Sequence, residues 1–433
     1  MAQAEPRVRT SGLDLAVVVA ASGLVVLAAV RGRELLAAGI DIFLAFPPLL
    51  AEWLPHVGPG TPIAIAVAVA AVTSGPALAD RLAWRPLLWT AWAGATAWTL
   101  GLALVDGWQR GIVERLTSTQ EYLHDVPRVS DIAVLLRTFA DHILTDQPGF
   151  WSTHVGAHPP GALLTFVLLD RIGLGGGGPS GVVVMLVASS ACVAVAVTLR
   201  ALGHEDLARR ALPFGVLLPG AVWMGVSADG LFAAVMAWGV ALLAIGATRR
   251  PSAALAGGLL LGFSLYLSYG LAVAGLIPLA VLMATRNVAA AALAVVGAAG
   301  VVAAFTLAGF WWFDGFAKVT VIYALSIAKD RPYTYFVWAN LAAVAIAMGP
   351  AVVAALRRTP ALPRGIAMVV GGALAALLLA DLSGYSKGEV ERIWLPFVVW
   401  LVVPCALLPN RHRWLAAQAL LALAVNHLLL TVW

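Results

Sequence analysis

The stretch LDLAVVVAASGLVVLAAV (residues 13–30) holds a single charged residue, Asp14. An apolar run of this length is close to the roughly 20 residues that an α-helix needs to cross a bilayer. The rest of the chain is similar, because 61% of its 433 residues are hydrophobic and only 11% are charged. A soluble domain cannot hide that much apolar surface, so the sequence predicts an integral membrane protein. The apolar runs are continuous rather than alternating, which favours helices over the strands of a membrane barrel.

Apolar runs of spanning length recur along the whole chain, separated by charged or Gly/Pro-rich breaks. They predict an all-α polytopic membrane protein with about 13 transmembrane helices. The expected spans are 13–30, 62–79, 86–105, 180–200, 211–226, 229–247, 252–267, 270–285, 288–308, 336–356, 364–382, 392–408 and 414–432.

Two further apolar segments do not fit a simple crossing. Segment 34–54 is interrupted by Asp41, Pro47 and Pro48, so we expect an interfacial or re-entrant piece. Segment 161–173 is too short to span comfortably. We expect it to be a helix that dips into the membrane and returns.

Arginines in the short loops set the expected orientation. With a cytoplasmic N-terminus, six basic loops fall on the cytoplasmic side of the plasma membrane, as the positive-inside rule requires. The exceptions are Arg31 and Arg33, which this topology places outside. The basic start MAQAEPRVRTSG (1–12) predicts an uncleaved anchor. The arginines of the six loops are Arg81, Arg85, Arg200, Arg209, Arg210, Arg249, Arg250, Arg286, Arg357, Arg358, Arg411 and Arg413.

This topology divides the chain into three parts. Residues 1–85 form an N-terminal helix pair with the interfacial segment, and 86–285 form a module with one long outer loop, 106–160. Residues 286–433 form C-terminal helices with outer loops 309–335 and 383–391. Acidic and basic residues cluster at the outer rim, which favours an enzyme that meets a lipid head group there. The net charge of +5 is explained by the basic loops, so no nucleic-acid partner is expected.

The first outer loop contains an expected amphipathic helix and a pair of carboxylates. SDIAVLLRTFADHIL (130–144) has apolar residues at helical spacing, with Ser130 as the expected N-cap. Glu121 and Asp125 are four residues apart and share a face if that stretch is helical. Neighbouring carboxylates raise each other's pKa, and one of them can then act as a general base. A solvated acidic turn is the alternative.

The same loop ends in HVGAHPPG (154–161). The two prolines disfavour helix at the preceding His158 and so spoil a helical spacing of His154 and His158. Without an evident third ligand, no metal site is predicted. A histidine base of a different membrane transferase, such as a ligase or acyltransferase, is an alternative role for this pair.

Charged residues at the other outer positions are candidates for binding. Asp229 begins a helix, where it either caps the helix or takes part in function. Lys329 and Arg331 flank Asp330 and could hold a phosphate, with snorkelling or an internal ion pair as the alternative. In KGEVER (387–392), positive charge on the outside needs a reason, and an arginine at the membrane rim is a functional candidate. The candidates in that segment are Lys387, Glu389, Glu391 and Arg392.

Together these features resemble the module of the GT-C glycosyltransferases over residues 86–285. Protein O-mannosyltransferases and aminoarabinose transferases carry an outer-loop acid followed by an HPPL- or KPPL-type motif, to which HPPG (158–161) is similar. RALGHEDLARR (200–210) resembles their basic cytoplasmic turn, and SADGLF (227–232) resembles their outer Asp motif. KGEVERIWLPF (387–397) is similar to actinobacterial integral membrane proteins, some of them methylthioxylose transferases. The composition, rich in Ala, Val, Leu and Gly, suits a GC-rich genome.

The resemblance implies an inverting transferase that moves a sugar from a polyprenyl-phosphate donor to a glycan or lipid of the cell envelope. It implies that Glu121 is the base, with Asp125 second, and that no cofactor is required, with a divalent cation left open. The sequence departs from the family in lacking an Asp-Glu pair directly after the membrane helix. Basic residues implied to hold the donor phosphate are Arg392, Lys387, Arg331, Lys329 and His158. Residues implied to contact substrate are Asp229, His154, Glu389, Glu391 and Tyr122.

Two alternatives of other classes stay open. A lipid or small-molecule transporter would more often show two matching halves and broken helices at mid-membrane, and no internal repeat is evident. A non-catalytic membrane scaffold would not need carboxylate and basic clusters that face one rim.

Overall fold

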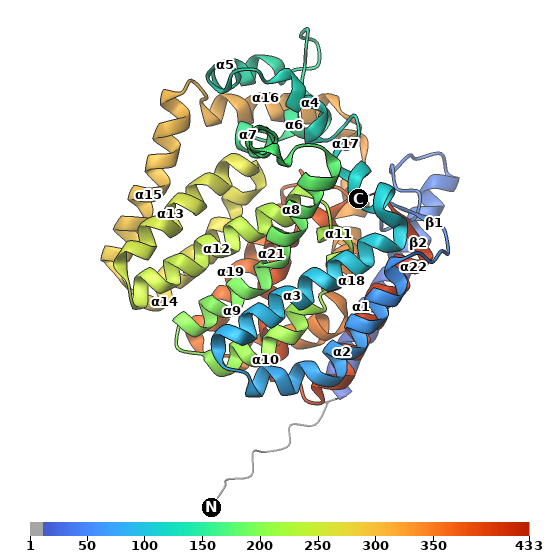
Figure 1. The fold of residues 1–433 in the computed structure, drawn as a ribbon. Helices are drawn as coiled ribbons and strands as arrows, with labels where there is room; N and C mark the ends of the chain where they lie inside the picture. The colour runs from blue at the N-terminus through green and yellow to red at the C-terminus, as the bar shows by residue number, and fades with distance from the viewer. Residues whose placement is uncertain (1–11, 433) are drawn as a thin grey trace, which may run out of the picture.

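The chain folds into a bundle of helices that is 79% helical and nearly all-α, as the sequence predicts (Figure 1). The computed structural model describes residues 12–432, so the basic start at 1–11 lies outside the described residues. Two short strands, β1 (Ala51–Trp53) and β2 (Leu429–Thr431), pair antiparallel. They tie the segment after the first helix to the end of the last one.

The helices are α1 Gly12–Ala37, α2 Gly60–Arg81, α3 Trp84–Ala103, α4 Tyr122–Asp125, α5 Ile132–Thr138, α6 Thr153–Ala157, α7 Pro160–Leu169, α8 Gly177–Ser189, α9 Ala191–Ala201, α10 Glu205–Val216, α11 Ala221–Met224, α12 Ala228–Thr248, α13 Pro251–Leu267, α14 Leu276–Thr285, α15 Val288–Leu307, α16 Trp312–Leu325, α17 Ile327–Asp330, α18 Tyr333–Leu356, α19 Arg364–Leu382, α20 Val390–Ile393, α21 Leu395–Leu401 and α22 Arg411–Leu428. Shorter 3₁₀ and π turns link them at Leu104–Asp106, Gln109–Val113, Glu114–Leu116, Val126–Arg128, Phe139–His142, Asp170–Leu174, Tyr269–Gly275, Thr359–Ala361 and Val403–Leu407.

Eight helical segments within residues 12–432 are long and apolar enough to cross a membrane, which supports the prediction of a polytopic membrane protein. They are Gly12–Ala37, Gly60–Arg81, Trp84–Asp106, Gly177–Ala201, Ala228–Thr248, Val288–Leu307, Tyr333–Leu356 and Arg364–Leu382. Shorter apolar helices cover Pro251–Leu267, Tyr269–Thr285 and Leu395–Leu407.

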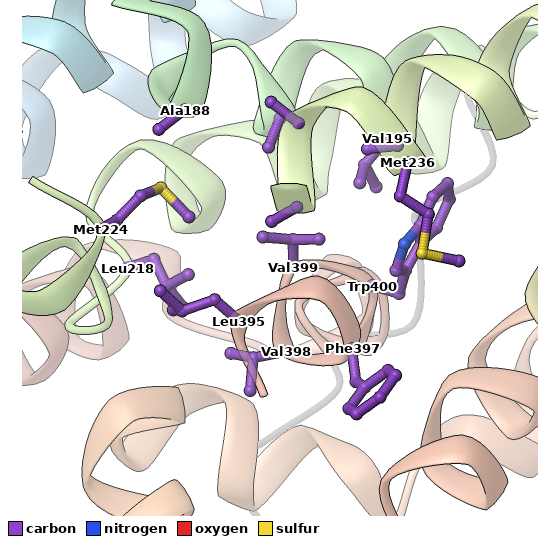
Figure 2. Packing of buried hydrophobic residues seen from close by; sticks show 14 of the residues in the cluster. Ala188, Val195, Leu218, Met224, Met236, Leu395, Phe397, Val398, Val399 and Trp400 are labelled. Atoms are coloured by element: carbon purple, nitrogen blue, oxygen red, sulfur yellow. The ribbon is translucent and has the colours of Figure 1, made fainter. Parts of the chain in front are cut away.

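The centre of the bundle is built around α21 and α12. Every residue of α21 is buried, so this helix is apolar all round and packs against neighbours on each side. Figure 2 shows Val399 and Trp400 of α21 close to Met236 of α12 and Val195 of α9. Because helices α1, α2 and α15 are exposed along most of their length, they form the periphery. Their exposed faces are apolar, as expected for contact with lipid.

The arginine-rich loops gather at one end of the bundle, which we call the arginine end. Arg411 pairs with Asp80 at 2.7 Å, Arg209 donates to the carbonyl of Leu82, and Arg249 donates to the carbonyl of Arg200. These contacts join the loops after α2, α9, α12 and before α22 in one place. The clustering is the three-dimensional counterpart of the positive-inside pattern.

A buried ion cluster also joins α1 to this end. Asp14 is fully buried and lies 2.7 Å from Arg357 and 2.6 Å from Arg358, in the loop between α18 and α19. Arg358 also donates to the carbonyl of Leu407. One carboxylate shared by two guanidinium groups therefore fixes where α1 begins against the rest of the bundle.

The opposite end, which we call the loop end, carries the predicted outer segments. Figure 1 shows α4 to α7 together with α16 and α17 at the top of the bundle. Helix α1 extends into segment 34–54 only as far as Ala37, and the chain from there to β1 is not helical. The break predicted from Asp41, Pro47 and Pro48 is therefore present. Segment 161–173 forms the short helix α7 and a π turn.

Three local predictions were wrong. The N-cap of α5 is Asp131, whose carboxylate accepts from the amides of Ala133 and Val134, and not Ser130. Asp is an equally good N-cap, and here it directly precedes the first helical residue. The predicted run 414–432 ends as a helix at Leu428 and continues as β2. The predicted run 211–226 is divided between α10 and α11.

Hydrogen bonds within the protein satisfy backbone groups that are left free where α10 and α11 are divided and where α18 is kinked. Between α10 and α11, the amide of Gly220 donates to the carbonyl of Ala347. At the kink of α18, Gln418 accepts from the amide of Ala351 and donates to the carbonyl of Met348. These bonds are needed because a backbone group left unpaired at membrane depth costs several kcal/mol.

We predict that Asp14→Asn lowers the free energy of unfolding by about 3 kcal/mol, because two arginines at a buried site lose their shared countercharge. Thermal unfolding of the purified protein in detergent measures the effect. Asp80→Asn, at the exposed pair with Arg411, is the control and should cost about 1 kcal/mol or less. Equal losses for the two variants would contradict the role given to Asp14.

Candidate functional site

Four predicted residues from distant parts of the chain meet at the loop end. Glu121 precedes α4, His154 lies in α6, Asp229 lies in the first turn of α12, and Arg392 lies in α20. Each of these side chains is buried or nearly so. The sequence predicted their common rim, and the structure brings their functional groups into contact.

Arg392 is the centre of this cluster. Its guanidinium lies 3.1 Å from Asp229, 3.5 Å from Glu389 and 4.0 Å from Glu121, and its side chain is 6% exposed. Three carboxylates around one buried guanidinium provide the compensation that a charge needs in such surroundings.

His154 links Arg392 to Glu121. Its Nδ1 lies 3.0 Å from Oε1 of Glu121, and its Nε2 lies 3.4 Å from Nη2 of Arg392. A guanidinium can only donate, so Nε2 must accept. Nδ1 is then the ring nitrogen that faces the carboxylate. His154 thereby orients the side chain of Glu121.

The two carboxylate oxygens of Glu121 differ, because Oε1 faces His154 and Oε2 does not. Within residues 12–432, its Oε2 is buried and has no hydrogen-bond partner. Burial opposes ionisation of this carboxyl most strongly, but His154 and Arg392 outweigh burial and bring the pKa of Glu121 below its usual value. Glu121 is therefore a carboxylate at neutral pH, with a lone pair ready to accept a proton from a ligand.

Asp125 has a different environment from Glu121. Helix α4 begins at Tyr122, so Glu121 is in extended conformation before the helix and the two carboxylates do not share a helical face. Asp125 is fully buried, with one oxygen 2.6 Å from Arg128 and the other accepting from the amide of Ser152. Both oxygens of Asp125 therefore hold loop 106–160 together.

Tyr122 and His158 form the wall beside Glu121. The Tyr122 hydroxyl lies 3.0 Å from Nδ1 of His158, and the Tyr122 ring stacks on Phe166. Nδ1 of His158 also lies 2.7 Å from the carbonyl of His154, which can only accept, so Nδ1 carries the proton. Burial lowers the pKa of His158 and keeps the ring neutral at pH 7. Its Nε2 is left as an acceptor.

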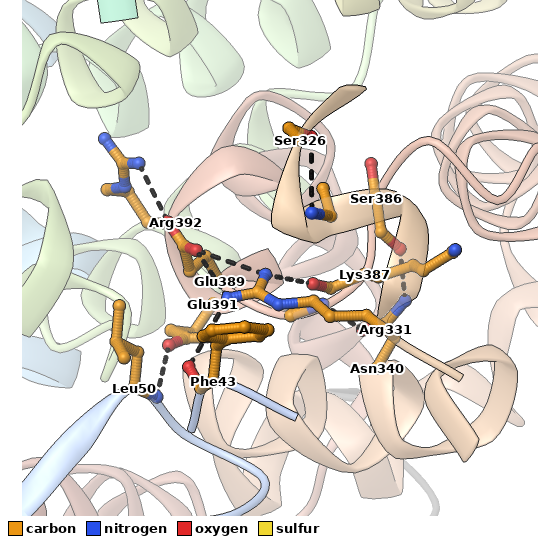
Figure 3. Close-up of polar contacts among 12 residues, drawn as sticks. Phe43, Leu50, Ser326, Arg331, Asn340, Ser386, Lys387, Glu389, Glu391 and Arg392 are labelled. Carbon is orange, nitrogen blue, oxygen red and sulfur yellow. Dashed lines mark hydrogen bonds and ion pairs between the residues drawn. The ribbon is translucent and has the colours of Figure 1, made fainter. Parts of the chain in front are cut away.

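The second predicted cationic group lies around Arg331, whose side chain is bonded to other parts of the protein. Arg331 is buried and donates to the carbonyls of Lys387 and Phe43, and it lies 3.3 Å from Glu389 (Figure 3). The side chain of Lys387 donates to the carbonyl of Lys329, which is itself exposed. Arg331 therefore anchors loop 383–391, while Lys387 and Lys329 lie nearer to the surface.

Asn340 and Asp381 form a buried polar network that the sequence pattern did not predict. Asn340 in α18 donates to Asp381 and to the carbonyl of Ser386, and it accepts from the amide of Gly388. This network holds loop 383–391 in the conformation in which Glu389 has φ +62°. A buried amide within an apolar helix is the signal that could have indicated it.

Glu391 lies behind Arg392 and contacts the segment after α1. Its Oε1 lies 3.4 Å from the amide of Leu50, which donates to it (Figure 3). Glu391 is fully buried, and burial raises its pKa to about 7. Nothing in the sequence indicated that residues 43–50 would contact Glu391. No group of three metal-binding side chains occurs within residues 12–432.

Comparison with protein-family models found no match for this chain, and searches of the curated proteins and of the solved structures found none either.

We predict that Glu391→Gln stabilises the protein at high pH more than at low pH. Glutamine still accepts from Leu50 but has no charge to bury. The folded-state pKa of Glu391 is raised from 4.5 to about 7, so wild-type stability is lost as the pH rises through this range. The advantage of the variant should grow by about 2 kcal/mol between pH 5 and pH 8.

Unfolding of both proteins by denaturant in detergent at pH 5 and pH 8 measures this difference. The control is Glu114→Gln, because Glu114 is exposed. An advantage for Glu391→Gln that is the same at both pH values would show that the carboxyl is not held protonated by burial.

Proposed function

We propose that the protein is a membrane-embedded inverting glycosyltransferase that moves a sugar from a polyprenyl-phosphate donor to a hydroxyl of a cell-envelope glycan or lipid. The observation that carries the proposal is the geometry of Glu121. Its Oε2 is buried without a hydrogen-bond partner in the described chain, while His154 holds Oε1. A fixed, ionised carboxylate with one oxygen that lacks a hydrogen-bond partner has the properties of a general base.

In the proposed reaction, Oε2 of Glu121 accepts the proton of the acceptor hydroxyl. The acceptor oxygen forms a bond to the anomeric carbon of the sugar, and the bond from that carbon to the phosphate oxygen breaks. The electron pair leaves with the polyprenyl phosphate. One displacement inverts the anomeric centre, so one essential carboxylate is sufficient, unlike the two of most glycosidases.

Roles for the remaining residues follow from their contacts. Asp229 and Glu389 are acceptors for sugar hydroxyls, and Arg392 keeps both in place beside Glu121. We propose that Lys387 and Lys329, near the surface of the loop end, meet the donor phosphate, since Arg392 and Arg331 are engaged by carboxylates. Cations near the leaving oxygen stabilise the charge that develops there. The chemistry needs no cofactor.

We further propose that the chain crosses the plasma membrane thirteen times, with the arginine end cytoplasmic and the loop end extracytoplasmic. Support comes from the three short apolar helical segments and from α10–α11 and α22, which together with the eight long segments make thirteen. The shared location of the basic loops supports the orientation.

A transporter is the second candidate, and the interruptions in α10–α11 and α18 favour it, because broken helices often line transport sites. The freed backbone groups at these interruptions bond to Ala347 and Gln418 instead. Such packing supports a structural role for the interruptions. Uptake of polyprenyl-phosphate sugars into liposomes without loss of the sugar would favour the transporter.

We predict that Glu121→Gln leaves the protein folded and reduces sugar transfer by at least about 100-fold, the usual contribution of a general base. The assay follows release of decaprenyl phosphate from a panel of decaprenyl-phosphate sugars by mass spectrometry, with the protein reconstituted together with cell-envelope extract. Glu114→Gln is the matched control at an exposed glutamate and should retain activity. Normal turnover by Glu121→Gln would remove Glu121 as the base.

We predict that Arg392→Gln shifts the acidic limb of the pH dependence of kcat/KM to higher pH. Arg392 helps to lower the pKa of Glu121, so its loss raises that pKa and the base is ionised only at higher pH. Arg392→Lys should restore part of the shift. Arg364→Gln, at an exposed position of the arginine end, is the control. An unmoved acidic limb would separate Arg392 from the base.

A further inference from the structure

A groove of about 460 Å³ runs along the periphery of the bundle between α1, α18 and α22. This volume falls within the range of about 300–1,000 Å³ that ligand pockets occupy. Ser22 is the polar side chain of the lining, and the others are apolar. The lining consists of Val18, Ala21, Ser22, Val25, Val26, Ala29, Phe46, Pro47, Pro48, Leu49, Ala345, Ile346, Pro350, Val353, Leu421, Val425 and Leu429.

The groove is bounded at the loop end by the segment Phe46–Leu49. This segment lies directly on α1, because a Cβ at Gly32 would come within 2.4 Å of Cβ of Pro47. Only a glycine allows so close an approach. The groove thus extends along three apolar helices and stops beneath a non-helical segment at the loop end.

Two charged residues, Arg33 and Glu391, contact the segment at this end of the groove. The guanidinium of Arg33 lies 5.6 Å from the ring centroid of Phe46, which lines the groove. The residue after Leu49 donates its amide to Glu391, the neighbour of Arg392. Arg33 is exposed at the loop end, where the positive-inside pattern does not account for it. A cation therefore lies over Phe46 at the edge of an apolar groove, and the segment that borders the groove contacts Glu391.

We propose that this groove binds the hydrocarbon chain of the polyprenyl-phosphate donor, and that Arg33 at its mouth adds to the positive charge that Lys387 and Lys329 present to the phosphate. The class of lipid rests on the proposed function. A chain gains little by leaving the bilayer for an apolar groove, because both surroundings are equally free of water. Packing against the three helices and the contact between phosphate and cation must therefore supply the selectivity.

The test uses a decaprenyl phosphate with a photoreactive group in its chain, added to the full-length protein in lipid nanodiscs. Adducts are located by proteolysis and mass spectrometry. We expect them within Val18–Ala29 of α1 and Leu421–Leu429, and unlabelled decaprenyl phosphate should displace them. A photoreactive phosphatidylcholine is the comparison for general lipid contact.

Matched variants test the groove and its mouth separately. Ala21→Phe and Ala345→Phe fill the groove and should reduce labelling by about tenfold, whereas Ala20→Phe, exposed on the same helix, should not. Arg33→Gln should also reduce labelling by about tenfold, the loss of one charge-assisted hydrogen bond. Arg137→Gln, an exposed cation on α5, is its control.

Labelling by phosphatidylcholine that equals that by decaprenyl phosphate, or adducts spread evenly over the exposed helices, would overturn the groove proposal. The transfer assay with Glu121→Gln is independent of that result. Transfer that depends on Glu121, together with labelling outside the groove, would leave the proposed function standing and refute the groove alone. Displaceable labelling in the groove, together with transfer that does not depend on Glu121, would support the groove as a lipid site and refute Glu121 as the base.

Discussion

A guanidinium buried at the loop end organises the candidate site. Burial of an unpaired charge costs several kcal/mol, so Arg392 requires carboxylates within reach. They come from loop 106–160, from the start of α12 and from the loop before α20, as Glu121, Asp229 and Glu389. These segments must converge for the charge to be compensated. The same requirement places His154 against both Glu121 and Arg392.

The surrounding contacts make this cluster rigid. On one side, Asp125 binds Arg128 and the amide of Ser152, which holds together the parts of loop 106–160 that carry Glu121 and His154. On the other side, Arg331 and Asn340 hold loop 383–391 through its backbone. Groups that must act within hydrogen-bond distance need such support, because a shift of 1 Å is enough to lose most of a catalytic contact.

The two ends of the bundle use charge in different ways. At the arginine end, Asp14 and Asp80 pair with arginines of separate loops and join helices to one another. At the loop end, three carboxylates surround Arg392, and the buried Oε2 of Glu121 has no hydrogen-bond partner within the described residues. The first arrangement is closed and stabilises the fold. The second leaves one buried carboxylate oxygen unpaired, and the segment that borders the apolar groove contacts Glu391, the sequence neighbour of Arg392.

The sequence by itself determined that the chain is helical and apolar enough for a membrane, because composition and run length act locally along each helix. It also indicated that Glu121, His154, Asp229 and Arg392 belong to one rim, since charge is costly elsewhere in such a chain. Only the tertiary structure decided that His154 bridges two of them, because His154 and Arg392 are 238 residues apart. It likewise decided that Asp125 contacts Arg128 and the amide of Ser152, and that Asn340 bonds to loop 383–391. Those roles depend on which partners packing brings within about 3 Å, and spacing along the chain does not encode that.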